Sequence, residues 1–96
     1  MRRLYIVTYD ICDPKRLRRV FRTLKGYGEH LQLSVFRCDL TRSQRLQLAS
    51  KLSATIEASD DQVMFVDLGP SNGRSCAVDF LGRPGPSGES RGPKVF

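Results

Sequence analysis

Cysteine and histidine are scarce in this sequence of 96 residues. The three cysteines, Cys12, Cys38 and Cys76, lie far apart, no Cys-x-x-Cys pair occurs, and His30 is the only histidine. A structural zinc site needs four such ligands, usually in closely spaced pairs. The composition therefore argues against a zinc site, and we interpret the cysteines as small apolar residues of a protein in a reducing compartment.

Long apolar runs are missing as well. No run approaches the ~20 residues that a membrane-spanning helix requires, and the first residues, Met1-Arg2-Arg3, lead directly into a strand-like alternation. The apolar core and small-residue cleavage site of a signal peptide are not seen there. We therefore expect a small cytoplasmic protein that does not act at a membrane.

Acidic residues are few in the first half of the chain. Residues 1–51 hold twelve Lys and Arg against four Asp and Glu, whereas residues 52–96 hold four against six. The two halves thus carry net charges of +8 and −2. Positive charge concentrated in one region favours a polyanionic partner such as nucleic acid, although a solvated surface is the alternative.

The first half also contains the clearest signals of secondary structure. Residues 3–10 alternate like a strand, with apolar side chains on both faces. Asp13-Pro14 is typical of a helix start, and the helix that follows has an apolar stripe of Leu17, Val20, Phe21 and Leu24. Residues 29–40 are β-rich and form either one bent strand or two short strands that meet near Ser34; we favour two.

A second helix and two further strands are predicted after residue 40. Thr41 to Gln44 has the pattern of a capping box. The helix that it begins is predicted to face the core with an apolar stripe of Leu46, Leu48, Ala49, Leu52 and Ile56. Residues 63–68 and 76–81 have the composition of strands. We assign residues 1–81 to a single domain and residues 82–96, rich in Gly, Pro and Ser, to a C-terminal tail.

The resulting order is βαββαβ with an extra C-terminal strand, an α+β arrangement of the ferredoxin-like type. Two helices cover one face of a four-stranded sheet, yet residues 3–10 and 63–68 are apolar on both faces. We therefore expect the second face to be buried against another copy, in a sheet-to-sheet homodimer. The extra strand would be free to cross to the partner.

Asp10 ends the first strand and is the first candidate for chemistry. Ending the strand is its alternative role. Mg²⁺ is typically held by one or two carboxylates together with waters and phosphates. If the dimer axis passes near this strand end, two copies of Asp10 share one Mg²⁺ ion, which suits phosphodiester hydrolysis.

The first predicted helix carries the second candidate group. Its arginines suit phosphate contacts because a guanidinium binds phosphate oxygens bidentately. They are Arg16, Arg18, Arg19 and Arg22. An exposed, solvated helix face is the alternative. A free RNA-binding module of the same topology is a further alternative, but the aromatic stacking motif of RNA-recognition domains is not present.

Several motifs together resemble one known family. The sequence is similar to the small CRISPR-associated adaptation proteins, the Cas-two endoribonuclease family, densely over residues 4 to about 46. The residues that carry this resemblance are Tyr9-Asp10-Ile11, Arg16-Leu17-Arg18, Tyr27-Gly28, Gln32 and Ser34-Val35-Phe36. Family members often have a basic residue in place of His30 and an acid in place of Arg37.

The resemblance implies a ferredoxin-like homodimer with stacked sheets, in which Asp10 is the metal-binding residue of each subunit. It implies that Tyr9, Arg16, Arg18, Ser34 and Phe36 lie at positions tied to activity or site architecture. It further implies Mg²⁺-dependent cleavage of single-stranded RNA or double-stranded DNA in some members, and a role with the CRISPR integrase in acquiring new spacers. The function expected is thus a metal-dependent endonuclease, or alternatively a non-catalytic DNA-binding hub.

Overall fold

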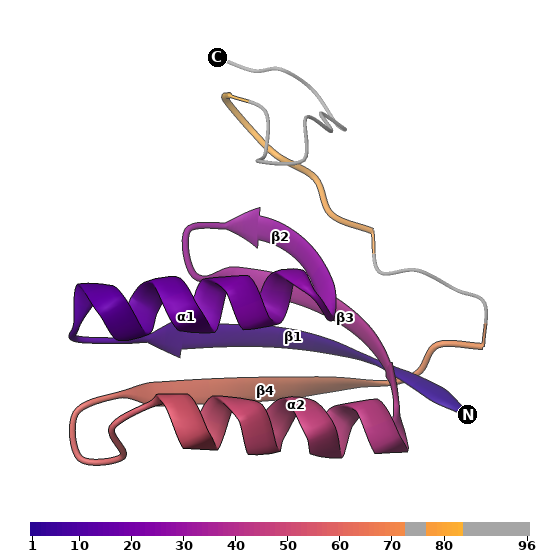
Figure 1. The fold of residues 1–96 in the computed structure, drawn as a ribbon. Helices are drawn as coiled ribbons and strands as arrows, with labels where there is room; N and C mark the ends of the chain where they lie inside the picture. The colour runs from indigo at the N-terminus through magenta and orange to yellow at the C-terminus, as the bar shows by residue number, and fades with distance from the viewer. Residues whose placement is uncertain (73–76, 84–96) are drawn as a thin grey trace.

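The computed structural model describes residues 1–72 and 77–83, and within them the predicted order βαββαβ is confirmed (Figure 1). The two short strands favoured for residues 29–40 are both present, separated by Leu33 and Ser34. The elements are β1 (Arg2–Asp10), α1 (Pro14–Lys25), β2 (Gly28–Gln32), β3 (Val35–Thr41), α2 (Arg42–Thr55) and β4 (Gln62–Pro70).

The four strands form one sheet in the order β2-β3-β1-β4, and each neighbouring pair is antiparallel. β1 is therefore paired on both edges, whereas β2 and β4 are the edge strands. Both helices pack on the same face of this sheet (Figure 1). This is the ferredoxin-like arrangement expected from the sequence.

Side chains at the helix starts explain why the chain leaves the strands where it does. The carboxylate of Asp13 accepts hydrogen bonds from the backbone N–H groups of Lys15 and Arg16, each at 3.0 Å. At the second helix, the hydroxyl of Thr41 accepts from the N–H of Gln44 at 3.1 Å, and the side chain of Gln44 accepts from the N–H of Thr41 at 2.9 Å. Both helices thus begin at the residues that the sequence indicated.

The core lies between the helices and the inner face of the sheet. Its side chains are contributed by β1, β3 and both helices, and those that are completely buried include Val7, Val20, Leu24, Phe36, Cys38 and Leu48. Leu46 was predicted to belong to the core stripe of α2, but 61% of it is exposed. The prediction was wrong because Leu46 and Leu48 are two residues apart, about 200° around a helix, and only one of them can face the sheet.

The outer face of the sheet, opposite the helices, carries apolar side chains that no helix covers. Met64 and Val66 of β4 are 50% and 39% exposed, and they pair in register with Thr8 and Ile6 of β1. The two-sided apolar character expected for β1 and β4 is therefore present in the structure. A small domain with such a face is suited to burying it against another protein surface.

Of the extra strand predicted for residues 76–81, the described residues 77–81 form no strand. Residues 77–83 are described and belong to no strand, while residue 76 lies outside the described part. A strand requires an edge to pair with, and the prediction that this segment pairs with a second chain remains a prediction. Most of the predicted tail, residues 84–96, lies outside the described residues. In the two described ranges, neither helix has the length and apolar character required to cross a bilayer.

Candidate functional site

Asp10 is the last residue of β1 and lies on the outer, helix-free face of the sheet. Its side chain has the same phase as Leu4, Ile6 and Thr8, and Gln62 is its partner in register on β4. The residue is exposed, and its carboxylate accepts no hydrogen bond from any described side chain or backbone group. Its oxygens are thus available to a ligand from solvent or from a second protein chain.

The predicted supporting residues form the scaffold that holds the end of β1. Tyr9 is 6% exposed, and its hydroxyl donates to the carbonyl oxygen of Leu33 at 3.2 Å. The N–H of Tyr9 donates to the carbonyl oxygen of Ser34 at 3.2 Å, and the ring of Phe36 is completely buried beside that of Tyr9. Burial raises the pKa of the Tyr9 hydroxyl, which therefore serves as a neutral hydrogen-bond donor at this position.

The donor chemistry near Asp10 fits a hard cation but is incomplete in one chain. Asp10 offers carboxylate oxygens and Gln62 an amide, and oxygen ligands are those that Mg²⁺ prefers. However, residues 1–72 and 77–83 contain no group of three or more Asp, Glu, His or Cys side chains placed to hold a metal ion. The described part of one chain thus offers fewer than three such side chains at any one place, and a full site at Asp10 would need a second copy or the phosphates of a substrate.

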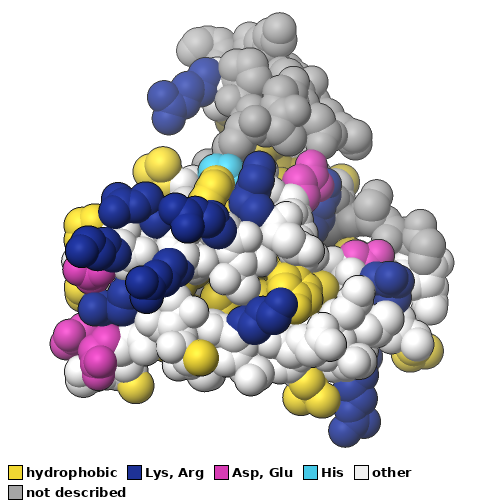
Figure 2. Space-filling view, in the orientation of Figure 1, with side chains coloured by type: hydrophobic (Ala, Val, Ile, Leu, Met, Phe, Trp, Pro, Cys, Tyr) yellow, Lys and Arg dark blue, Asp and Glu magenta, His cyan; other side chains and the backbone are white. Residues whose placement is uncertain are grey.

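The α1 helix presents a strongly basic surface on the helix side of the sheet. Six of its twelve residues are Lys or Arg, and none is acidic. Arg18, Arg19 and Arg22 are exposed, and their spacing of three and four residues places their side chains near one another on the helix surface. Figure 2 shows the resulting cluster of basic side chains over α1.

Arg16, the fourth predicted phosphate contact, is instead engaged by a buried aspartate. Its Nε and one terminal nitrogen donate to the two carboxylate oxygens of Asp61 at 2.7 and 3.2 Å. The side chain of Asp61 has no exposed surface, whereas that of Arg16 is 26% exposed. The structure therefore separates Arg16 from the free arginines of α1.

Asp61 also binds two backbone groups and so connects two loops. Its oxygens accept from the N–H of Cys12, in the loop that follows Asp10, at 3.0 Å, and from the N–H of Glu57 at 2.9 Å. The guanidinium of Arg16, followed by these two N–H groups, holds the pKa of Asp61 well below its usual range. The sequence pattern did not identify Asp61 as a buried residue, because two consecutive aspartates after a helix are also typical of an exposed turn.

Comparisons with known proteins point to one family. Residues 1–74 match the family model of CRISPR associated protein Cas2. A protein named CRISPR-associated endoribonuclease Cas2 1 from Rhodospirillum rubrum is 49% identical over 79 residues, which are 82% of this chain and 78% of that protein. The CRISPR-associated endoribonuclease Cas2 of Geobacter sulfurreducens is 39% identical over 83 residues, which are 86% of this chain and 87% of that protein.

Solved structures are similar in fold as well as in sequence. The hypothetical protein TT1823 from Thermus thermophilus has a TM-score of 0.74 and 32% identity, covering 90% of this chain and 96% of that chain. The Cas2 structure from Streptococcus pyogenes has a TM-score of 0.65 and 31% identity, covering 78% of this chain and 98% of that chain. The likeness therefore extends over the whole βαββαβ unit.

The Asp61 contacts predict a specific dependence of stability on pH. Because the folded-state pKa of Asp61 lies below its ordinary value of 3.8, its contribution is complete above pH 4 and is lost as the pH falls further. We expect Asp61→Asn to lower the urea midpoint at pH 7, and the difference from wild type to shrink below pH 4. Urea unfolding followed by circular dichroism at pH 7 and pH 3 measures both effects.

The adjacent Asp60 provides the matched control, because it is exposed and its side chain makes no recorded hydrogen bond with a described residue. Asp60→Asn removes the same charge and should leave the midpoint nearly unchanged. Equal midpoints for the two variants at pH 7 would contradict the role assigned to the Arg16–Asp61 pair.

Proposed function

We propose that this chain, which belongs to the family of CRISPR-associated protein Cas2, is a metal-dependent endonuclease. In this proposal, Asp10 of two chains binds the metal. The observation that carries this proposal is the position of Asp10, an exposed and unpartnered carboxylate at the edge of an apolar, uncovered sheet face. The relatives from Rhodospirillum rubrum and Geobacter sulfurreducens are named as endoribonucleases, which supports phosphodiester hydrolysis as the reaction class.

The proposed homodimer joins the outer faces of two sheets. A two-fold axis that relates the two faces makes the same patch meet itself, and an axis near the end of β1 would bring two Asp10 carboxylates together. Two carboxylates and the phosphate oxygens of a substrate would complete an oxygen ligand set for Mg²⁺. The bound ion would supply Lewis-acid activation of the phosphodiester.

The residues of the chain itself would position this site and its substrate. Tyr9 and Phe36 fix the end of β1 by burial, and the carbonyl of Ser34 holds the Tyr9 N–H. The free arginines of α1 lie on the helix side of the sheet, and we expect them to bind the backbone of single-stranded RNA or double-stranded DNA. Cytoplasmic nucleic acid is the substrate that this proposal requires.

A non-catalytic DNA-binding hub is the second candidate function. It is favoured by the basic surface of α1, which lies on the opposite side of the sheet from the face that carries Asp10. In this role the dimer would grip duplex DNA and join the CRISPR integrase during spacer acquisition, without chemistry at Asp10. The two functions differ in whether the carboxylate is required.

Removal of the Asp10 carboxylate tests the catalytic proposal. We expect Asp10→Asn to reduce Mg²⁺-dependent cleavage of end-labelled single-stranded RNA or duplex DNA by at least about 100-fold, since a bound metal typically contributes several kcal/mol to the barrier. Asp39→Asn is the matched control, because Asp39 is also an exposed strand carboxylate, and it should cut like wild type. If the purified wild type does not cut and Asp10→Asn still supports spacer integration, the hub is correct.

The proposed dimer predicts a mass that depends on the outer face. Wild-type protein at micromolar concentration should have twice the 10.9 kDa mass of one chain, and Val66→Glu should be monomeric because it places a charge in the apolar contact. Leu17→Glu on α1 is the control, since both residues are 39% exposed. Light scattering during size-exclusion chromatography measures the mass, and a monomeric wild type would refute the shared site.

The arginines of α1 predict the salt dependence of binding. Replacing Arg18 and Arg19 by Gln should reduce the magnitude of the log–log slope of affinity against salt by about 1.8 on duplex DNA, or about 1.4 on single strands. Arg16→Gln should change the slope less and the stability more, because Arg16 is already paired with Asp61. Fluorescence anisotropy with labelled DNA and RNA between 50 and 300 mM salt, at roughly neutral pH, is the measurement. If Arg16→Gln changes the slope by half as much as the double variant does, Arg16 contributes as much as Arg18 or Arg19, and it would belong to the nucleic-acid interface.

A further inference from the structure

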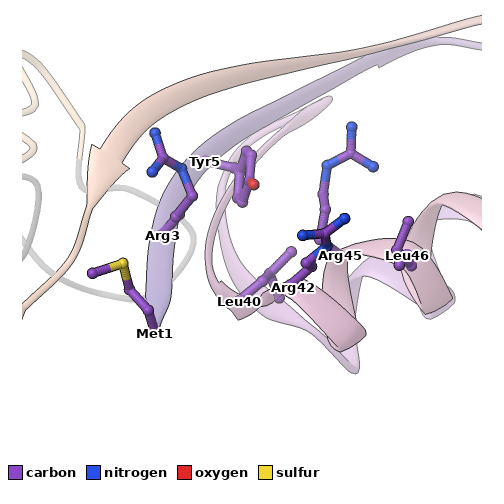
Figure 3. A pocket seen from close by; sticks show the side chains of 7 residues that line it. All are labelled: Met1, Arg3, Tyr5, Leu40, Arg42, Arg45 and Leu46. Atoms are coloured by element: carbon purple, nitrogen blue, oxygen red, sulfur yellow. The ribbon is translucent and has the colours of Figure 1, made fainter.

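A second group of arginines lines a pocket at the opposite end of β1 from Asp10. The pocket has a volume of about 490 Å³, within the range of sites that hold small ligands or peptide side chains. Asp10 lies seven positions after Arg3 in the sequence, which is roughly 23 Å along a strand, so the two sites are distinct. The lining residues are Met1, Arg3, Tyr5, Leu40, Arg42, Arg45 and Leu46 (Figure 3).

The interior of this arginine pocket is mainly apolar. Tyr5 and Leu40 are buried and form its inner wall, whereas Met1 and Leu46 are 86% and 61% exposed and flank its opening. Leu46 is the α2 residue that the sequence pattern wrongly placed in the core. Exposed apolar side chains around a pocket favour an occupant with an apolar group to bury.

Guanidinium groups stand on both sides of the pocket (Figure 3). The guanidinium of Arg45 lies 3.7 Å from the ring centre of Phe65 and 5.5 Å from that of Tyr5. Stacking of this kind fixes the plane of the guanidinium and leaves the N–H groups at its edge free to bind a carboxylate bidentately. Arg42 is exposed and makes no recorded hydrogen bond or ion pair within the described ranges.

The charge of the pocket is only partly balanced by the residues that the structure describes. Asp67 is the acid in contact with Arg3, at 3.1 Å, and it also accepts from the N–H of Gly69 at 2.8 Å. The pKa of Asp67 is lowered by the Gly69 N–H, by Arg3 and, more weakly, by Arg45. With one carboxylate for three guanidiniums, Arg42 and Arg45 remain available to an anionic occupant.

We propose that the arginine pocket is a docking site for a short segment of a partner protein, in which an apolar side chain is flanked by carboxylates. The apolar side chain would contact Leu40, Met1 and Leu46, and the carboxylates would bind Arg42 and Arg45. A nucleic-acid strand fits less well, because its phosphates bury no apolar group. Its bases would find no open aromatic face either, since Tyr5 is 9% exposed and lies beneath Arg45.

Selection from a random peptide library tests this proposal. Phage-displayed hexapeptides are selected on the wild-type protein and counter-selected on the double variant Arg42→Gln, Arg45→Gln. We expect enriched sequences that combine Asp or Glu with Leu, Ile or Phe. A synthetic peptide of the enriched sequence should bind wild type in fluorescence anisotropy and bind the double variant at least about 10-fold more weakly.

Two controls distinguish binding in the arginine pocket from a general attraction of acidic peptides to a basic protein. The variant Arg18→Gln, Arg19→Gln removes the same two charges from α1 and should bind the peptide like wild type. A peptide with its apolar residue replaced by Ser should bind at least about 10-fold more weakly. Arg42→Gln alone is a second test variant, because Arg42 makes no hydrogen bond or ion pair with a described residue and takes no part in the stacking of Arg45 on Phe65 and Tyr5; it should also weaken peptide binding.

Several results would overturn the proposal. One is that selection enriches no sequence with both acidic and apolar residues. The others are that the pocket variant and the α1 variant bind the peptide equally, and that the Ser-substituted peptide binds wild type as tightly as the original peptide does. A loss of RNA or DNA affinity in Arg42→Gln, Arg45→Gln as large as that in the α1 variant, without peptide binding, would assign the pocket to nucleic acid. None of these results depends on cleavage at Asp10.

Discussion

The central constraint on this molecule is that β1 is paired on both edges while two helices cover only one face of its sheet. The side chains of a strand alternate between faces, so Val7 and Tyr9 enter the core and Ile6, Thr8 and Asp10 face away from it. The core and the candidate site are thus two sides of the same strand. Whatever binds the outer face contacts a surface whose shape is set by packing on the inner face.

The charged residues divide into groups with different roles. The guanidinium of Arg16 is held by a buried carboxylate, whereas Arg18, Arg19 and Arg22 are exposed on a helix without acids. The third group, Arg3, Arg42 and Arg45, lies at the starts of β1 and α2. Its guanidinium groups line a pocket together with apolar side chains. The +8 charge of the first half of the chain is therefore spread over surfaces that differ in what surrounds the guanidinium groups.

The sequence was sufficient for the element order, the helix caps and the family, because each of these depends on local patterns. Asp13-Pro14 and Thr41 to Gln44 specify helix starts within a few residues, and the structure places both helices there. The sequence was insufficient where the outcome depends on residues far apart in the chain. The Arg16–Asp61 pair joins positions separated by 45 residues, and no local pattern distinguishes Arg16 from Arg18 or Arg19.

The candidate site shows the same division between local and distant information. Asp10 was identifiable as a strand-ending acid, but its free carboxylate and its position on the uncovered face follow from the sheet as a whole. The sequence pattern wrongly assigned Leu46 to the core because the predicted apolar stripe of α2 included positions on more than one side of the helix. The exposed side chain of Leu46 is one of the features that define the arginine pocket.

The contacts of Asp61 have a mechanical consequence. A single side chain ties the first turn of α1 and the loop after Asp10 to the segment that precedes β4. Force applied to α1 by a bound and bent polymer would be transmitted through this joint into β4 as well as into the short loop from β1. The end of the molecule that carries Asp10 would then resist deformation as a unit, and the position of the Asp10 carboxylate would be preserved.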